Sequence, residues 1–188
     1  MSDTQTLATG ASLTPETFAD FITRLKYHCR GEGVSDHCTA DAIFNVEEKR
    51  IVTGIDTDYT DDLIVFCEDR EWFSPADYWK SAGINLRKKL NAKARLLTDG
   101  DTFMKANPRV QWDTLSELED HTVTGYVEKW EYVNSHFTRE AAEAFIRRKR
   151  HDYRELRVYV DANIYCWEFN AIKEALMDGR LVLVEKKS

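Results

Sequence analysis

The sequence lacks any apolar run close to the ~20 residues that a membrane-spanning helix needs. It contains no G-x-S-x-G, no phosphate-binding G-x-x-x-x-G-K-[ST] loop and no G-x-G-x-x-G motif, which removes the common nucleophile and nucleotide signatures. Its first twelve residues have neither a basic stretch nor an apolar core, so no signal peptide is expected. We therefore predict a cytoplasmic protein with no membrane partner, no cofactor and no catalytic residues. In that compartment its cysteines stay reduced; they are Cys29, Cys38, Cys67 and Cys166.

What is present is the composition of a folded chain. The 188 residues are 43% hydrophobic and 12% aromatic, enough for a packed core. The order of the expected elements predicts an α+β fold: an N-terminal helix with a β-hairpin, then a C-terminal β-α-β-α-β unit on a mixed or antiparallel sheet.

The first half of the chain shows clear element boundaries. Thr14 as N-cap and Pro15 in the first turn begin a helix that extends to residue 30. Alternating apolar residues predict strands over 39–56 and 62–69. Ser74 and the proline after it begin a further helix that is interrupted by a glycine and extends to residue 97.

The last third alternates strands and helices. We expect strands over 121–133, 156–162 and 180–185, with helices over 138–151 and 167–179.

These elements predict four regions. Residues 1–13 are expected to be a disordered lead, 14–97 a helix/hairpin/helix region, 98–120 a polar linker, and 121–188 a C-terminal α/β module.

The C-terminal third carries a recognisable pattern. A Trp-bearing strand is followed by Phe137-Thr138 at a helix start, a basic segment that ends at His151, and the strand Arg157-Val-Tyr-Val160. This pattern resembles a module at the end of many phage and prophage proteins of proteobacteria. Residues 36–56 also resemble a strand that often precedes this module in such proteins. Together the resemblance covers about two thirds of the chain and implies a phage-encoded accessory protein in the host cytoplasm. An Arg-Asn pair usual in that module is replaced here by Cys166-Trp167.

Charge is distributed unevenly. Residues 1–79 hold 6 Lys and Arg against 16 Asp and Glu, whereas residues 80–120 and 121–188 are slightly basic. An acidic surface can imitate DNA phosphates and be steered to a basic groove. We therefore expect a non-enzymatic inhibitor of a host defence complex, of the anti-CRISPR or anti-restriction type. The predicted partner-binding residues are Asp56, Asp58, Asp61, Asp62, Glu68, Asp69, Glu71, Trp72 and Trp79.

An alternative function uses the basic segment 147–157 to bind nucleic acid directly. Such a run is also typical of the solvated face of a helix, and the acidic first half opposes contact with a nucleic-acid backbone. Its candidate residues are Arg147, Arg148, Lys149, Arg150, Arg154 and Arg157.

A third alternative is a metal-dependent nuclease or a structural zinc protein. Glu47-x-Lys49 on a strand, with Asp36 or Asp41 upstream, resembles the end of a restriction-type nuclease motif. Two His-Cys pairs offer zinc ligands but lack C-x-x-C spacing, so a helix end and a strand start are the favoured interpretation. The weak zinc candidates are His28, Cys29, His37 and Cys38.

Overall fold

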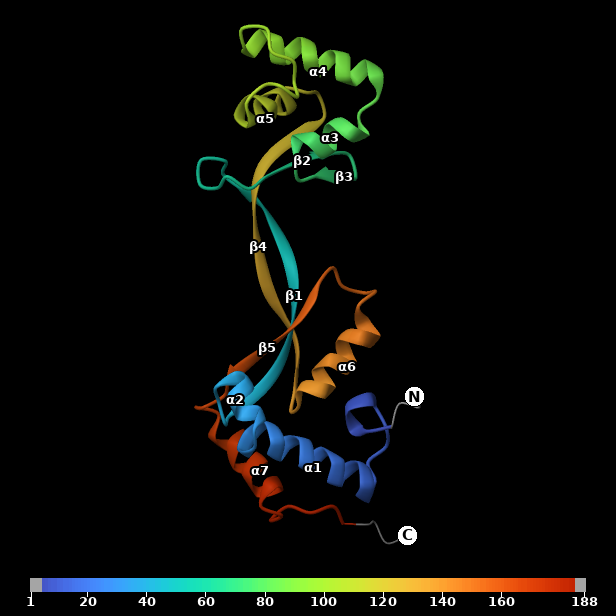
Figure 1. The fold of residues 1–188 in the computed structure, drawn as a ribbon, viewed down its shortest axis with the longest axis vertical. Coiled ribbons are helices and arrows are strands. Elements are labelled where there is room, and N and C mark those ends of the chain that lie inside the picture. Colours follow the sequence, from blue (N-terminus) through green and yellow to red (C-terminus); the bar gives the residue numbers. More distant parts are fainter. Residues whose placement is uncertain (1–4, 185–188) are drawn as a thin grey trace. The chain divides into compact units, whose positions relative to one another are not determined.

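A computed structural model describes residues 5–184 (Figure 1). Its helices are η1 (Leu7–Thr9), α1 (Pro15–Arg30), α2 (Gly33–His37), α3 (Pro75–Ser81), α4 (Ile84–Leu97), α5 (Pro108–Ser116), α6 (Arg139–Lys149) and α7 (Trp167–Met177). Its strands are β1 (Ala42–Ile55), β2 (Leu63–Cys67), β3 (Arg70–Trp72), β4 (His121–His136) and β5 (Leu156–Ala162). The strands form one antiparallel sheet in the order β3-β2-β4-β1-β5, which confirms the predicted α+β class.

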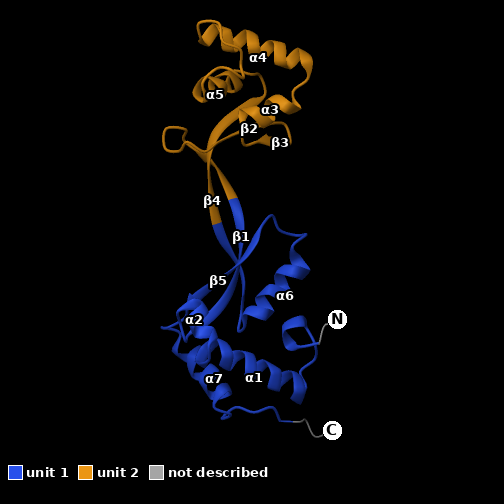
Figure 2. Cartoon of the chain, viewed as in Figure 1, with its two compact units in different colours: residues 1–50, 130–188 blue, residues 51–129 orange. Residues whose placement is uncertain are grey.

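The chain divides into two compact units, coloured in Figure 2. Unit 1 comprises residues 1–50 and 130–188, and unit 2 comprises residues 51–129. Strands β1 and β4 each contribute residues to both units. The division therefore cuts through two long strands and does not follow the predicted boundaries at 98 and 121.

Unit 1 builds its core on the paired strands β1 and β5. Residues 42, 44, 46 and 48 of β1 are buried and their neighbours are half-buried, which is the period-2 pattern of a strand with one covered face. Phe44 is fully buried, and helix α6 covers this face through Ala142. Helices α1 and α7 meet in a second cluster around Leu25 and Met177.

Unit 2 packs helices α3, α4 and α5 beside β2 and β3. Phe103 and Leu115 are fully buried in its core, although both lie in the segment predicted as a linker. Asn107 caps α5 by accepting a hydrogen bond from Val110 N–H at 3.0 Å, and Asn91 Oδ1 accepts one from Phe103 N–H at 3.0 Å. These side-chain hydrogen bonds and the buried ring order a stretch whose local composition is polar.

Local capping signals located the starts of α1, α3 and α6. The side-chain oxygens of Thr14, Ser74 and Thr138 each accept a hydrogen bond from the backbone N–H three residues later. The expected strand over 180–185 is absent from 180–184, the part of it that the structure describes. In the expected disordered lead, residues 1–4 lie outside the described chain, whereas Leu7–Thr9 form a turn of 3-10 helix that contacts α6.

Candidate functional site in unit 2

The acidic loop, residues 56–62, connects β1 to β2 within unit 2. Its aspartates are exposed, and two short-range hydrogen bonds order its backbone. Asp56 Oδ1 accepts from Asp58 N–H at 3.0 Å, and Thr60 Oγ1 accepts from Asp62 N–H at 3.1 Å. These are local turns that Asp and Thr form readily, and they order the backbone that carries the loop carboxylates.

A glycine in β4 lets the acidic loop lie directly on the sheet. A Cβ on Gly125 would collide with Thr60 Cγ2 and lie 2.9 Å from the Ile55 carbonyl oxygen. Beside it, Thr124 Oγ1 donates to the Ile55 carbonyl at 3.1 Å, and Tyr126 N–H donates to the Asp62 carbonyl at 2.9 Å. The absence of a side chain at residue 125 therefore allows both ends of the loop to be held against β4.

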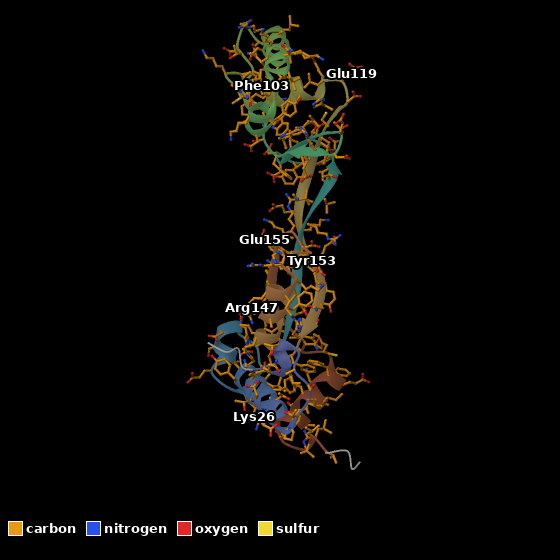
Figure 3. All side chains as sticks on the ribbon, turned by 90° about the vertical axis from the view of Figure 1, so that its right-hand side faces the viewer. Lys26, Phe103, Glu119, Arg147, Tyr153 and Glu155 are labelled. Carbon is orange, nitrogen blue, oxygen red and sulfur yellow. The ribbon has the colours of Figure 1, made fainter. Side chains whose placement is uncertain are left out.

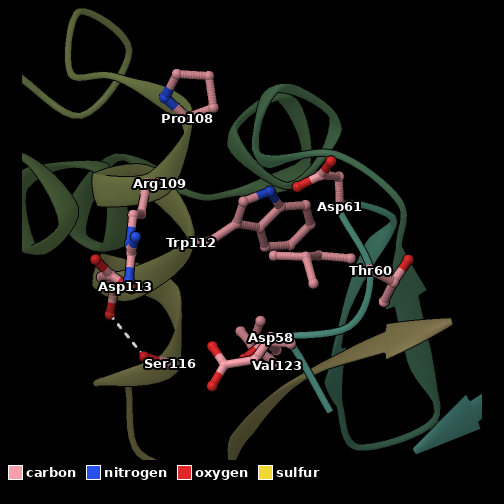
Figure 4. A pocket seen from close by; sticks show the side chains of 11 residues that line it. Asp58, Thr60, Asp61, Pro108, Arg109, Trp112, Asp113, Ser116 and Val123 are labelled. Carbon is pink, nitrogen blue, oxygen red and sulfur yellow. Dashed lines mark hydrogen bonds between the residues drawn. The ribbon is translucent and has the colours of Figure 1, made fainter. Parts of the chain in front are cut away.

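The acidic loop and α5 enclose a cavity of about 640 Å³ (Figure 4). Trp112 points from α5 toward the loop residues Thr60 and Asp61, and its ring is half-buried against the core of unit 2. The other lining residues are Thr57, Asp58, Leu63, Pro108, Arg109, Asp113, Ser116 and Val123.

The lining suits a cationic group. The charged groups in the lining are three carboxylates, those of Asp58, Asp61 and Asp113, and one guanidinium, that of Arg109. An aromatic ring binds an ammonium or guanidinium over its face, and partial desolvation strengthens that attraction. Carboxylates add charge-assisted hydrogen bonds to the same groups. The cavity therefore has the chemistry to hold an arginine or lysine side chain beside Trp112.

A second acidic group lies at the other end of β2. Glu68 and Asp69 follow the strand. Its last residue, Cys67, pairs with His121 of β4, and Glu119 and Asp120 directly precede His121 in the chain. Figure 3 shows Glu119 at the margin of unit 2. Burial, together with the negative charges of Glu68 and Asp120, raises the pKa of the Cys67 thiol.

The predicted acidic surface is thus two groups separated by a five-residue strand, roughly 17 Å at about 3.4 Å per residue. The sequence prediction missed Asp113, Glu119 and Asp120. In the sequence these three residues were visible as acidic residues, but they lie in the segment that was predicted to be a linker.

The two tryptophans predicted as partner-binding residues pack on the core of unit 2. Trp72 meets Tyr78 edge-to-face at 4.9 Å between ring centroids. Trp79 stacks on Phe103 at 5.7 Å, and the Arg87 guanidinium lies 5.3 Å from its ring centroid. Both rings are half-buried, so they contribute mainly packing area to unit 2. The remaining member of the predicted set, Glu71, is exposed in β3 opposite Phe66.

Tyr78, buried in the same core, is hydrogen-bonded to the half-buried His121. His121 Nδ1 donates to the Glu119 carbonyl at 2.7 Å, so Nε2 of the neutral ring accepts a hydrogen bond from the Tyr78 hydroxyl at 2.7 Å. Burial, with a smaller effect of Cys67, raises the pKa of Tyr78 to about 12. Near neutral pH this phenol is therefore protonated and acts as a structural donor.

The basic segment 147–157 lies in unit 1 and is partly paired. Arg157 binds Glu47 at 2.7 Å and lies 4.2 Å from the Trp130 ring centroid. Lys149 binds Asp152 at 2.7 Å. Arg147, Arg148 and Arg150 are exposed in or next to the last turn of α6, where positive charge favourably meets the carbonyl end of the helix. Arg154 is also exposed, and its backbone N–H donates to Glu48 at 3.4 Å. The structure thus gives part of this segment an internal role.

The histidines of the two His-Cys pairs lie side by side, with ring centroids 5.9 Å apart, and both rings pack on Phe44. The cysteines differ, since Cys29 is buried and Cys38 is exposed. His28 is buried on α1, and its Nε2 lies 3.0 Å from Glu140 Oε2, while His37 packs its ring on Phe44. Burial lowers the pKa of His37 and raises that of Cys29, which keeps both groups neutral. Within residues 5–184, no three His, Cys, Asp or Glu side chains are arranged to hold a metal ion.

The predicted strand start at the second His-Cys pair was wrong. His37 ends α2 and Cys38 follows as its left-handed C-cap with φ 59°, whereas β1 begins only at Ala42. The pair therefore belongs to a helix end and not to a strand start.

The nuclease-like residues are also dispersed. Glu47 is engaged with Arg157, and Lys49 lies 3.7 Å from Glu155. Asp36 lies in α2, while Asp41 binds the buried Lys173 at 3.6 Å. The carboxylates of the expected motif thus have separate partners or positions.

No protein-family model matches the chain, and neither the curated proteins nor the solved structures contain a match to it. No helix within residues 5–184 is long and apolar enough to cross a membrane.

Proposed function

We propose that this chain is a phage-encoded, non-enzymatic binding protein that inhibits a bacterial defence complex of the anti-CRISPR or anti-restriction type. Unit 2 docks through the acidic loop on the positively charged groove in which the target holds nucleic acid. One observation carries the proposal: the loop carboxylates border a concave cavity that contains an aromatic ring.

The physical basis is competition with phosphate. Unit 2 holds 15 Asp and Glu against 10 Lys and Arg, a net charge of −5, and its aspartate-rich loop contains no cation. Such a surface accelerates encounter with a basic groove and occupies the Lys and Arg side chains that bind a nucleic-acid backbone. The inhibitor would act by occupancy, and no reaction is required.

The cavity adds geometric selectivity to that attraction. A target arginine would lie against Trp112 and donate to Asp58 and Asp61. Anchors of this kind, at the centre of an interface, provide most of the binding free energy, while exposed charges at its margin mainly affect the association rate.

The test is a nuclease-treated affinity capture from a bacterial lysate, followed by titration of the captured protein. We expect a nucleic-acid-binding defence protein at near-equal stoichiometry, displaced by added duplex DNA or guide RNA. The double variant Asp58→Lys/Asp61→Lys should weaken binding about 100-fold, because several charge-assisted contacts change sign.

Asp99→Lys/Asp101→Lys is the matched control, since it makes the same charge change on another exposed loop of unit 2. Equal loss in both double variants would show that net charge alone acts and would remove the role of the cavity. Absence of any protein target, combined with salt-dependent binding of the chain to nucleic acid, would replace this proposal with the alternative based on residues 147–157.

A further inference from the structure

Strand β5 forms an open edge of the sheet in unit 1. It ends the strand order, and its inner side pairs with β1. Lys49 N–H donates to the Glu155 carbonyl at 2.9 Å in the same register, so odd-numbered residues of β5 carry the hydrogen bonds to β1. Val158 and Val160 therefore direct their backbone N–H and C=O groups outward.

This edge is neither shortened nor bulged, and its charged residues, Arg157 and Asp161, carry opposite signs. Edge strands are usually shortened, bulged, or interrupted by proline or lysine. Strand β5 has seven residues, LRVYVDA, with no proline, no lysine and an unbroken register. Within residues 5–184, no hydrogen bond from another element uses the outward groups of Val158 or Val160. At the other end of the sheet, β3 has only three residues.

The strand is complementary to itself in one antiparallel register. Arg157, Tyr159 and Asp161 share the face away from α6. With a two-fold axis at Tyr159, Arg157 lies opposite Asp161 of the second copy, twice by symmetry. On the other face, Val158 lies opposite Val160, which forms the hydrogen-bonded pairs.

Alternative registers lose this match. Outward groups pair only when the register changes in steps of two residues. A register shifted by two residues in one direction places Arg157 opposite Tyr159. It also places Asp161 opposite Glu155, so that two carboxylates repel each other. A shift by two residues in the other direction places Arg157 opposite Asn163, so the ion pair with Asp161 is lost. Asp161 is exposed and forms no ion pair within the described chain, so its carboxylate is available.

We propose that the chain forms a two-fold homodimer in which the β5 strands of two copies pair in the register centred on Tyr159. The occupant of this edge is a second copy of the chain because its charges and its apolar residues both match under that symmetry. Three exposed apolar residues directly follow the strand and provide further surface there: Ile164, Tyr165 and Trp167, with 53%, 87% and 77% of their surface exposed. The inference does not depend on the proposed function.

The experiment is sedimentation velocity of the full chain from 1 to 100 µM. We expect a species of twice 21.9 kDa in the wild type. Asp161→Lys should raise the dimer dissociation constant roughly tenfold or more, because two attractive cross-strand pairs become repulsive. An equimolar mixture of D161K and the double variant Glu47→Lys/Arg157→Glu, which keeps an ion pair between β1 and β5, should recover dimerisation, since each new pair in the heterodimer then joins opposite charges.

Two further variants make the outcome decisive. Asp99→Lys makes the same charge change in unit 2 and should leave the dimer intact. Val160→Pro removes one outward N–H, which an edge strand tolerates, and should abolish the dimer with an unchanged circular dichroism spectrum. A monomer at 100 µM would refute the proposal. So would a dimer unaffected by both D161K and V160P.

Discussion

Unit 1 and unit 2 differ in net charge and in where their charged side chains lie. Unit 1 is nearly balanced, with 16 Lys and Arg against 18 Asp and Glu, and places titratable groups such as His28 inside its core. Unit 2 carries a net charge of −5, leaves most carboxylates in solvent, and buries Tyr78, which is hydrogen-bonded to the half-buried His121. Internal ion pairs order the first unit, whereas the second presents its charge outward. The two proposals use this difference, since the proposed partner recognition lies in unit 2 and the proposed dimer contact in unit 1.

Removing the central ring of each core should give the largest effects. Phe44→Ala and Phe103→Ala each delete a fully buried phenyl ring and should lower the stability of their own unit by about 3–5 kcal/mol. Urea titrations followed by two-dimensional NMR would report each unit separately. An equal loss in both units from either variant would show that they unfold as one body.

Opposite ends of the pH scale should affect the two units. Burial lowers the pKa of His37 and His136, and the His28 hydrogen bond lowers that of Glu140. The unfolded chain then binds more protons, so unit 1 loses stability as pH falls below about 6.5, and further as Glu140 titrates.

In unit 2, the pKa of Tyr78 is raised from 10 to about 12, so the unfolded chain releases its proton first as pH rises. Unit 2 should therefore lose stability between pH 10 and 12, by at most about 2.7 kcal/mol. The same NMR-detected titrations at pH 5, 7 and 10.5 would measure both effects. Tyr78→Phe should weaken the alkaline loss, and its persistence in that variant would contradict the assignment.

Gly125→Ala should displace the acidic loop. The new methyl group would collide with Thr60 and approach the Ile55 carbonyl, so we expect a loss of about 2 kcal/mol and weaker binding of the partner. Gly83→Ala is the matched control in unit 2, because no atom lies within 4 Å of its added Cβ. Thermal unfolding of both variants gives the comparison. Equal melting temperatures would show that the loop does not need the close approach.

The helix caps should give the smallest effects. Thr138→Ala in unit 1 and Ser74→Ala in unit 2 each remove one acceptor at a helix start and should cost about 1 kcal/mol. Thr138 is buried and Ser74 is half-buried, so the loss at Thr138 should be the larger. Chemical denaturation of the two variants would measure this difference, and the reverse order would contradict it.

Local sequence signals specify several of the individual helices and strands. Caps at Thr14, Ser74 and Thr138 and the alternation in β5 act over a few residues, so the helix starts and the strand 156–162 were predictable. The acidic loop was predictable for the same reason, since four aspartates within seven residues lie close together in any fold.

Distant segments combine through contacts that exist only in the folded chain. The polar composition of 98–120 indicated a linker, but burial of Phe103 and Leu115 makes it part of the core of unit 2. Trp112 and Asp113 join the acidic loop only through the packing of α5, and Glu119 joins Glu68 only through the pairing of β2 with β4. Such contacts depend on burial of apolar surface and on strand register between residues far apart, which no local pattern encodes.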